Sequence, residues 1–331
     1  MATRNAITDI PGVRVGHAGD GKLGSGTTVV VFDKPVTASV DVRGGGPGTR
    51  ETALLDPAQT VEGIDAIVLS GGSAFGLDAA SGTQAYLREI GRGFRIRDAV
   101  VPIVPAAIMF DLLNGGDKNW GRYPPYREFG YEAAKNAGTD VALGSAGAGL
   151  GATTATLKGG VGTASAMTPD GITVGALVVV NAVGTTVIGD GPHFWAAPFE
   201  QGKEFGGRGW PSSISPSDLA IRAKGGAQEN TTIGLIATDA ALNKAQCNRL
   251  AVMAQDGLAR AIYPVHTPLD GDTIFSAATG VKPLADPFYG LASLGMLAAN
   301  VMARAIARGV CEAKALPFAG SLPSWKDKFG K

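Results

Sequence analysis

Apolar and polar residues alternate or cluster along this chain in ways that predict β-strands. In VTASVDVR, residues 36–43, valine and alanine fall on one face and polar residues on the other, which predicts a strand with one polar face. Longer runs rich in β-branched residues end at glycine or polar residues, as buried central strands do. They lie at residues 64–70, 172–180, 231–239 and 272–280.

Apolar residues at helical spacing follow several of these strands. Helices are expected over 77–90 and over 242–261, the second with Asp239 as a possible N-cap. A third is predicted to begin at Asp286–Pro287. Because the strands come in groups and the helices cover them, the pattern favours an α+β layered sandwich over a regular βαβ repeat. The polar stretch 192–230, rich in Gly, Pro and Ser, is the long linker-like segment.

Composition narrows the class of protein. Glycine makes up 49 of 331 residues, about twice the usual ~7%, and the glycines gather at the ends of the predicted elements. This placement is typical of tight turns in a strand-rich fold. The 29 Lys and Arg balance the 29 Asp and Glu, and no basic run is present, so nucleic acid is not an expected partner.

The start of the chain, its apolar runs and its cysteines predict a soluble, cytoplasmic protein. The start, MATRNAITDIPGV, has no apolar region of the signal-peptide kind, and the apolar run ITVGALVVVNAVG is too short to span a bilayer. No membrane association is therefore expected. Cys247 and Cys311 fall in helix-like segments, which predicts buried free thiols rather than a disulfide or a metal pair.

Several familiar motifs fail on inspection. Residues 16–23 have P-loop spacing, but Leu23 stands where Ser or Thr must ligate Mg²⁺. The run SGGSAFG resembles a nucleophile elbow, yet Phe75 replaces the second glycine. We therefore interpret Ser73 as a helix cap or as a wall of the substrate site.

Metal sites are not indicated either. Asp270-Gly271-Asp272 opens like a calcium loop, but Ile274 takes the fifth position and no glutamate closes the loop at the twelfth. The three histidines form no ligand cluster. No metal and no cofactor are predicted.

The junction between Asn230 and Thr231 is the strongest chemical candidate. If that peptide bond breaks, Thr231 carries a free α-amine, with a pKa of about 7.7–8.0, beside its own hydroxyl. One residue then supplies both nucleophile and base, as in N-terminal threonine hydrolases. Its position at the head of a predicted buried strand would hold it rigidly.

Such a nucleophile needs an acidic partner and an oxyanion donor. Asp270 and Asp272, two apart on an extended segment, are predicted to share a face and a proton and to orient the amine and hydroxyl. Asn181, at the end of a valine-rich strand, is a polar amide that could hold an oxyanion. The same residues also have ordinary readings, since threonines start strands, DGD forms turns and Asn begins loops.

The chain resembles, along nearly its whole length, the self-processing L-aminopeptidase D-amidase/esterases and β-peptidyl aminopeptidases (the DmpA type), relatives of nylon oligomer hydrolase. The resemblance rests on ordered blocks: ITDIPGVRVGHA, VDVRGGGPGTRET, IDAIVLSGGSAFGLDAASG, GSAGAGLGAT, KGGVGTASA, VGALVVVNAVG, ENTTIGLIATDA and HTPLDGDTIFSAATG. It implies an αββα sandwich of the N-terminal-nucleophile type and a single domain over 1–331, cleaved into chains 1–230 and 231–331.

By position, the resemblance assigns Thr231 as nucleophile, Asn181 as oxyanion residue and the Asp270/Asp272 pair as its orienting acids. Lys158 is the lysine nearest to the place of a family lysine, near Thr156, and the resemblance therefore implies a catalytic role for it. Phe110, in PIVPAAIMFD, is assigned with Ser73 to substrate binding.

The implied activity is hydrolysis of amide bonds in short peptides or amino acid amides through a Thr231 acyl-enzyme. The alternatives are a nylon-oligomer-type endo-amidase and an ornithine acetyltransferase-like acyltransferase. Ala106 replaces a glutamate that would hold a substrate ammonium in aminopeptidases, which counts against a strict aminopeptidase. A homo-oligomer, a tetramer of processed pairs, is the expected assembly.

Overall fold

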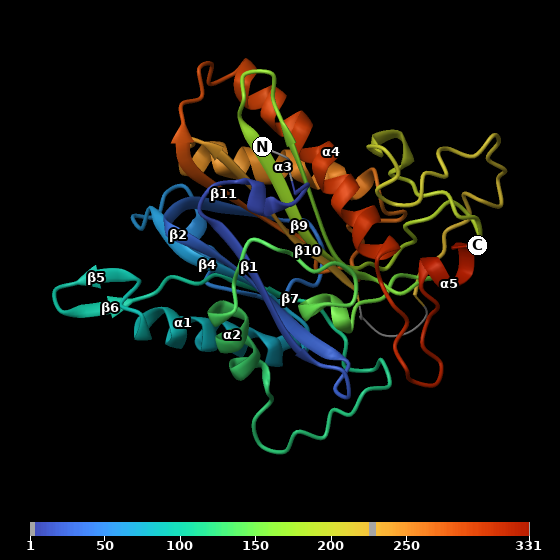
Figure 1. Ribbon diagram of the computed structural model, residues 1–331, viewed down its shortest axis with the longest axis horizontal. Helices are drawn as coiled ribbons and strands as arrows, with labels where there is room; N and C mark the ends of the chain where they lie inside the picture. Colours follow the sequence, from blue (N-terminus) through green and yellow to red (C-terminus); the bar gives the residue numbers. More distant parts are fainter. Residues whose placement is uncertain (1–3, 225–229, 331) are drawn as a thin grey trace.

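The computed structural model describes residues 4–224 and 230–330, and most of the strands in this part join one sheet. The strands of that sheet are β1 (Val13–Asp20), β2 (Ser25–Val42), β3 (Thr49–Arg50), β4 (Gly63–Ser70), β7 (Ala106–Ile108), β8 (Gly160–Met167), β9 (Thr173–Asn181), β10 (Thr231–Ala240) and β11 (Thr273–Lys282). Among the described residues, these nine strands follow the order β3-β7-β4-β2-β11-β10-β9-β8, with β1 beside β2 (Figure 1).

The long strand β2 belongs to both halves of this sheet. Its first part pairs with β1 and β4, and its end, the predicted strand at 36–43, pairs with β11. Between the two parts, the register against β4 shifts between Val31 and Val36. Such a shift bends and twists a strand, and it allows the two halves of the sheet to face each other.

Helices cover the outer faces of the two halves. They are α1 (Ala79–Glu89), α2 (Tyr126–Lys135), α3 (Lys244–Ala259), α4 (Tyr289–Cys311) and the short α5 (Trp325–Phe329). In Figure 1, α1 and α2 lie below the strands, and α3 and α4 lie above them. A two-stranded hairpin of β5 (Phe94–Ile96) and β6 (Ala99–Val101) extends beyond α1.

The buried side chains separate the layers. One cluster fills the space between the two halves of the sheet. It contains Leu177 of β9 and Leu235 of β10 on one side, and Phe32 of β2 and Ile67 of β4 on the other. A second packs α3 and α4 on β8 to β11, and a third packs α1 and α2 on β2 and β4. The order is therefore helix, sheet, sheet, helix, which agrees with the layered sandwich predicted from the pattern and with the αββα order that the family resemblance implies.

The predicted strands and helices are present, with one error at a helix start. Helix α3 is capped by Asn243, whose side chain accepts from the N–H of Gln246, and not by Asp239. Asp239 is buried at the end of β10, where it accepts from the N–H of Thr173 (2.8 Å) and pairs with Lys282 (2.9 Å). Buried ladder pairing thus extends the strand past the residue that resembled a cap.

Helix α4 is long and apolar enough to cross a membrane, with a mean hydropathy of 1.4 over its apolar window. However, 61% of that window is buried inside the protein, where it packs against α3, β8 and β9. The apolar side chains of α4 therefore form part of the hydrophobic core.

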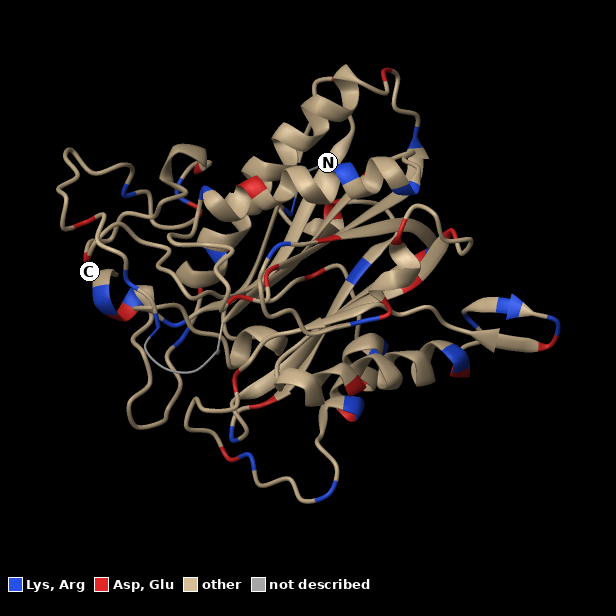
Figure 2. Cartoon of the chain, turned by 180° about the vertical axis from the view of Figure 1, so that it is seen from behind, with Lys and Arg blue, Asp and Glu red and all other residues tan. Residues whose placement is uncertain are grey.

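Acidic and basic residues are interspersed over the helices and loops of the described chain (Figure 2).

Two further expectations are met. Cys247 and Cys311 are buried free thiols in α3 and α4. The described part of the polar stretch 192–230 is irregular apart from a 3-10 turn at Ala197–Phe199. Residues 225–229 of that stretch lie outside the described residues.

Candidate active site

Thr231 and Asn181 meet where the two central strands β10 and β9 begin and end. They are directly opposite partners in the antiparallel ladder between these strands. Opposite residues project to the same face, with Cβ atoms about 4.5–5.5 Å apart. Thr231 shares the face of Ile233 and Leu235, which fill the space between the half-sheets. Both side chains therefore lie at the edge of the central core, and Thr231 is only 4% exposed.

The Asn181 amide is held in a fixed orientation. Its Nδ2 donates to the carbonyl of Phe110 (3.1 Å), and its Oδ1 accepts from the N–H of Thr153 and from the Nζ of Lys224 (both 3.0 Å). Sequence reasoning missed Thr153 and Lys224, because both lie in irregular segments with no periodic pattern. The predicted oxyanion residue is thus a preoriented amide beside Thr231.

The hydroxyl of Thr231 contacts the carbonyl of the preceding residue. Thr231 Oγ1 donates to the carbonyl oxygen of Asn230, which also accepts from the N–H of Gly271 (3.1 Å). Asn230 forms a parallel bridge with Asp270, which continues the β10–β11 pairing. The peptide bond between 230 and 231 is therefore held inside the sheet.

Gly271 makes room for the hydroxyl. A Cβ at this position would lie 2.7 Å from Thr231 Oγ1 and 2.8 Å from the carbonyl oxygen of Gly46, both closer than real Cβ contacts. The glycine between the two aspartates therefore allows the segment that leads into β11 to approach Thr231. A turn at Asp270-Gly271-Asp272 alone would not explain why glycine stands there.

The two aspartates lie together but bond to separate donors. Asp272 Oδ1 accepts from the N–H of Thr232 (2.8 Å), and Asp270 Oδ1 accepts from the N–H of Val183 (3.2 Å). Burial, and then the charge of Asp272, raise the pKa of Asp270. The hydrogen bonds of the described residues include none between the two carboxylates and none from the Thr231 hydroxyl to either. The geometry therefore gives the predicted shared proton no support.

Lys158 is a buried amine next to the same strands. It is 1% exposed, and its Nζ donates to the carbonyls of Gly149, Ala152 and Gly159 at 2.7–2.8 Å. Burial lowers the pKa of Lys158 to about 7, against the opposing charge of Asp111. The structure thus places Lys158 beside the groups that hold Asn181.

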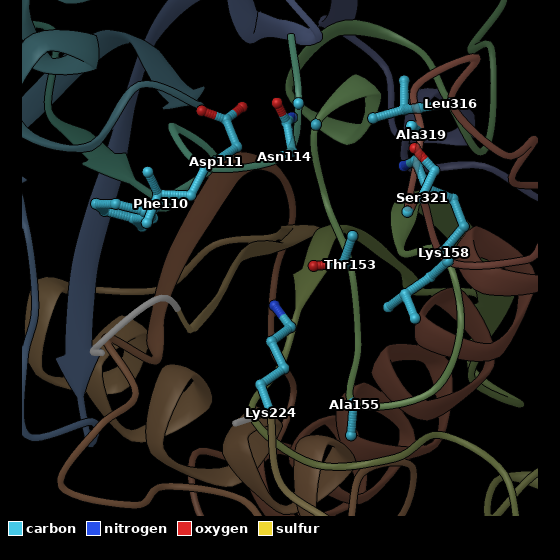
Figure 3. A pocket seen from close by; sticks show the side chains of 15 residues that line it. Phe110, Asp111, Asn114, Thr153, Ala155, Lys158, Lys224, Leu316, Ala319 and Ser321 are labelled. Atoms are coloured by element: carbon cyan, nitrogen blue, oxygen red, sulfur yellow. The ribbon is translucent and has the colours of Figure 1, made fainter. Parts of the chain in front are cut away.

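These groups surround a cavity of about 430 Å³ (Figure 3). It is lined by Phe110, Asp111, Leu113, Asn114, Gly115, Gly151, Thr153, Ala155, Lys158, Lys224, Leu316, Ala319, Gly320, Ser321 and Leu322. Figure 3 shows Asp111 and Lys224 entering from opposite sides. Thr153 and Lys224 link the cavity to Asn181, so the predicted residues Phe110 and Lys158 belong to one site with it.

Asp111 is the buried carboxyl of this cavity, and sequence reasoning missed it. Its oxygens accept from the hydroxyl of Ser25 (2.7 Å) and from the N–H of Gly72 (2.8 Å). Burial raises the pKa of Asp111 to about 6, although these hydrogen bonds and the charges of Lys118 and Lys158 act in the opposite direction.

Ser73 is not the helix cap that was one of its two predicted roles, and its role in substrate binding stays a prediction. Gly72 is the N-cap of the 3-10 helix Ser73–Asp78, and no side chain makes a cap hydrogen bond there. Ser73 has a left-handed φ of 53°, and it is absent from the lining of the cavity. Its backbone N–H donates to the carbonyl of Met109 (3.0 Å), so its part is to close the turn after β4.

The sequence profile of Peptidase family S58 matches residues 5–321. The chain belongs to this family. An uncharacterized aminopeptidase of Mycobacterium tuberculosis is 46% identical over 346 aligned positions, with 98% of each chain covered. A 6-aminohexanoate-oligomer endohydrolase of Kocuria sp. is 29% identical, over 89% of this chain and 80% of that one.

Solved structures of the same fold support the membership. A β-aminopeptidase of Burkholderia sp. superposes with a TM-score of 0.73 at 25% identity, over 99% of this chain and 92% of that one. The L-aminopeptidase D-Ala-esterase/amidase of Ochrobactrum anthropi, described as a variant of the N-terminal-nucleophile hydrolase fold, gives a TM-score of 0.70 at 21% identity over 98% and 91%. The predicted family and sandwich are confirmed, and the S58 member described here is a hydrolase.

Proposed function

We propose that this S58 hydrolase cleaves itself between Asn230 and Thr231 and then hydrolyses amide bonds through an acyl-enzyme on Thr231. The observation that carries the proposal is the position of the Thr231 hydroxyl, against the Asn230 carbonyl and opposite the fixed Asn181 amide. A nucleophile, a peptide carbonyl and an amide donor meet there at the end of two buried strands.

In the first step, Thr231 Oγ1 attacks the carbonyl carbon of Asn230. The C–N bond of the peptide breaks, the hydroxyl proton passes to the departing nitrogen, an ester forms between Asn230 and the threonine oxygen, and the α-amine of Thr231 is released. Water then hydrolyses the ester and leaves an Asn230 carboxylate and a free N-terminal Thr231. The chain divides into fragments of 230 and 331 − 230 = 101 residues.

In the second step, the free α-amine accepts the proton of its own hydroxyl while the oxygen attacks a substrate carbonyl. The Nδ2 group of Asn181 stabilises the resulting oxyanion, a contribution of typically 10²–10³-fold in rate. The protonated amine donates its proton to the leaving amine, and water releases the acyl group as an acid. Asp272 accepts from the N–H of Thr232, next to Thr231, and Asp270 accepts from the N–H of Val183, near Asn181. The two aspartates thereby hold the backbone beside the nucleophile and beside the oxyanion donor.

The substrate is proposed to be a short peptide or an amino acid amide. Relatives named as aminopeptidases support an acyl donor with a free amino group. The cavity favours the second candidate, an endo-acting amidase on longer or blocked amides. Among its described lining residues Asp111 is the single carboxylate, and it already accepts hydrogen bonds from Ser25 and Gly72. The relative named as an oligomer endohydrolase agrees with that candidate.

We also propose that the two fragments remain one cytoplasmic unit and assemble into a tetramer of processed pairs. The halves share a sheet, since β10 pairs with β9 and β11 pairs with β2. Separation would break these ladders and open the central core.

The test compares the wild-type chain with Thr231→Ala and Thr231→Ser. We expect fragments of 230 and 101 residues for the wild type and for the serine variant, and a single full-length chain without amidase activity for the alanine variant. A denaturing gel with intact-mass analysis and a chromogenic aminoacyl amide give the two readouts. Processing and hydrolysis that survive in Thr231→Ala would contradict the proposal.

A substrate panel decides between the candidates. Free-amine and N-blocked versions of the same amide are compared by kcat/KM, with and without an added amine acceptor. A preference for blocked amides favours the endo-acting candidate, whereas transfer of the acyl group to the added amine would point to an acyltransferase.

A further inference from the structure

His266 and Thr267 are consecutive residues that each hold one carboxylate of the aspartate pair. The N–H and the ring Nδ1 of His266 both reach Asp272 Oδ2, at 3.1 and 2.9 Å. The N–H and the hydroxyl of Thr267 both reach Asp270 Oδ2, at 3.0 and 2.8 Å. One oxygen of each carboxylate thus accepts two hydrogen bonds from a single residue.

The other oxygen of each carboxylate is then directed at the site. Asp272 Oδ1 holds the N–H of Thr232, the residue after Thr231. Asp270 Oδ1 holds the N–H of Val183, two residues after Asn181. The two aspartates are each 1% exposed, so their hydrogen bonds form away from water. Buried polar groups whose hydrogen bonds are satisfied make the surrounding structure more rigid.

We infer that His266 and Thr267 are positioning residues, which orient Asp272 and Asp270 so that the backbones carrying Thr231 and Asn181 keep their alignment. This inference rests on the proposed function of Thr231. It assigns the two residues no contact with substrate. Neither residue stands in a regular strand, and their roles follow from four donors that converge on two oxygens.

The backbone of His266 adds to this picture. Its φ of 55° is left-handed, a conformation that costs free energy for residues other than glycine and is tolerated best by asparagine and aspartate. In this left-handed conformation the N–H and the ring of His266 both reach the same oxygen of Asp272. Asparagine at 266 would tolerate the backbone and keep a donor near the Nδ1 position, whereas glycine would relax the backbone and remove the donor.

Matched variants test the inference in the full-length chain. Thr267→Val removes the hydroxyl at nearly constant shape, and Thr267→Ser keeps it. His266→Gly removes the ring donor without backbone strain, and His266→Asn retains an amide donor. The readouts are the rate at which the 101-residue fragment appears after cell-free synthesis, and kcat, KM and thermal midpoint of the processed enzyme.

We expect Thr267→Val and His266→Gly to slow processing and lower kcat by about 10–100-fold, the usual effect of removing a group that orients a reacting residue, with KM within about twofold. Thr267→Ser and His266→Asn should stay within about threefold of the wild type. This rescue by the donor-retaining variants is what a purely structural role would not produce.

Two outcomes would overturn the inference. One is wild-type processing and kcat in both Thr267→Val and His266→Gly, and the other is equal loss in the donor-retaining and donor-lacking members of each pair. Thr231→Ala keeps this result separate from the proposed function. If that variant is inactive while the positioning variants are unaffected, the inference fails and the threonine mechanism stands.

Discussion

Asn181 and Thr231 face each other across the ladder between β9 and β10, at the last residue of one strand and the first of the other. Their backbones are fixed by a sheet that is buried on both faces. The amide of Asn181 is further held by Phe110, Thr153 and Lys224. The arrangement needs little reorganisation, which is the condition under which an amide donor stabilises an oxyanion well.

Replacing Asn181 by aspartate tests the oxyanion role. Asn181→Asp keeps oxygen acceptors for Thr153 and Lys224 but loses the Nδ2 donor. We expect kcat for amide hydrolysis to fall by about 10²–10³-fold, because one donor to the oxyanion is gone. Steady-state kinetics on processed enzyme measure it. Asn136→Asp, on an exposed turn after α2, is the matched control, and kcat of Asn181→Asp within threefold of that control would contradict the role.

Adding a methyl group at Gly271 tests the close approach of the segment before β11 to the proposed nucleophile, Thr231. In Gly271→Ala the new Cβ would lie 2.7 Å from Thr231 Oγ1, so the hydroxyl must move. We expect self-cleavage to slow by about 100-fold or more, since small misplacements of a reacting atom have effects of that size. Fragment formation on a denaturing gel gives the rate. Gly138→Ala, whose Cβ meets no heavy atom within 4 Å, should be processed normally. Equal rates in the two variants would show that the contact is unimportant.

The buried carboxyl of Asp111 should make stability depend on pH. Its folded pKa of about 6 lies above the reference value of 3.8, so between these pH values the folded state keeps a proton that the unfolded state has lost. This contribution to stability is present at low pH and is lost as the pH rises through about 6. The free energy of unfolding of the wild type, relative to Asp111→Asn, should therefore fall by roughly 2 kcal/mol from about pH 4 to about pH 7.

Urea denaturation at several pH values measures this difference. The control is Asp98→Asn, an exposed position in the turn between β5 and β6, which should show no such dependence relative to the wild type. A flat difference between wild type and Asp111→Asn would mean that the carboxyl titrates normally.

Arg304 should tie the two expected fragments together. It is 2% exposed in α4, and its guanidinium pairs with Glu204 at 2.6 and 2.9 Å and donates to Asn5 Oδ1 and to the carbonyl of Ser165. All these partners precede residue 231. Arg304→Met leaves Glu204 buried with fewer partners, and breaking one side of a buried pair costs about 3–5 kcal/mol.

Chemical denaturation of the processed protein checks this cost, and size-exclusion chromatography shows whether the fragments still co-elute. Arg127→Met breaks the exposed pair with Asp78 and should cost less than about 1 kcal/mol. Similar costs in the two variants would place Arg304 outside the forces that join the halves.

The regular elements were largely predictable, because burial leaves a periodic mark on the sequence. Strands β9, β10 and β11 and helices α3 and α4 lie within a few residues of their predicted ranges. The misassigned cap at Asp239 shows the limit of this logic. A capping residue type is a local signal, and the partners Thr173 and Lys282 that hold Asp239 in the strand are distant in sequence.

The site itself was only partly predictable. Thr231, Asn181, Asp270 and Asp272 could be proposed from the sequence because each interrupts an apolar pattern or fits a known family, and the structure places them close together. Thr153, Lys224, Asp111 and His266 lie in irregular segments, where no periodicity marks a side chain that folds back onto the site. The cap role of Ser73 was wrong because Gly72 is the N-cap of the following 3-10 helix, and the positive φ of Ser73 is a property of the backbone that a residue type does not reveal.

The sequence by itself determined the buried strands, the layered class of fold and the threonine junction, because these depend on the order of apolar and polar residues along the chain. Tertiary structure alone decided that Asn181 lies opposite Thr231, that Gly271 makes room for the hydroxyl, and that His266 and Thr267 grip the two carboxylates. The first two of these contacts join residues dozens of positions apart, and their geometry is set by strand register and by the folding of the sheet, neither of which a local pattern contains. The contacts of His266 and Thr267 are short in sequence, but they depend on the backbone of an irregular segment, which has no periodic pattern.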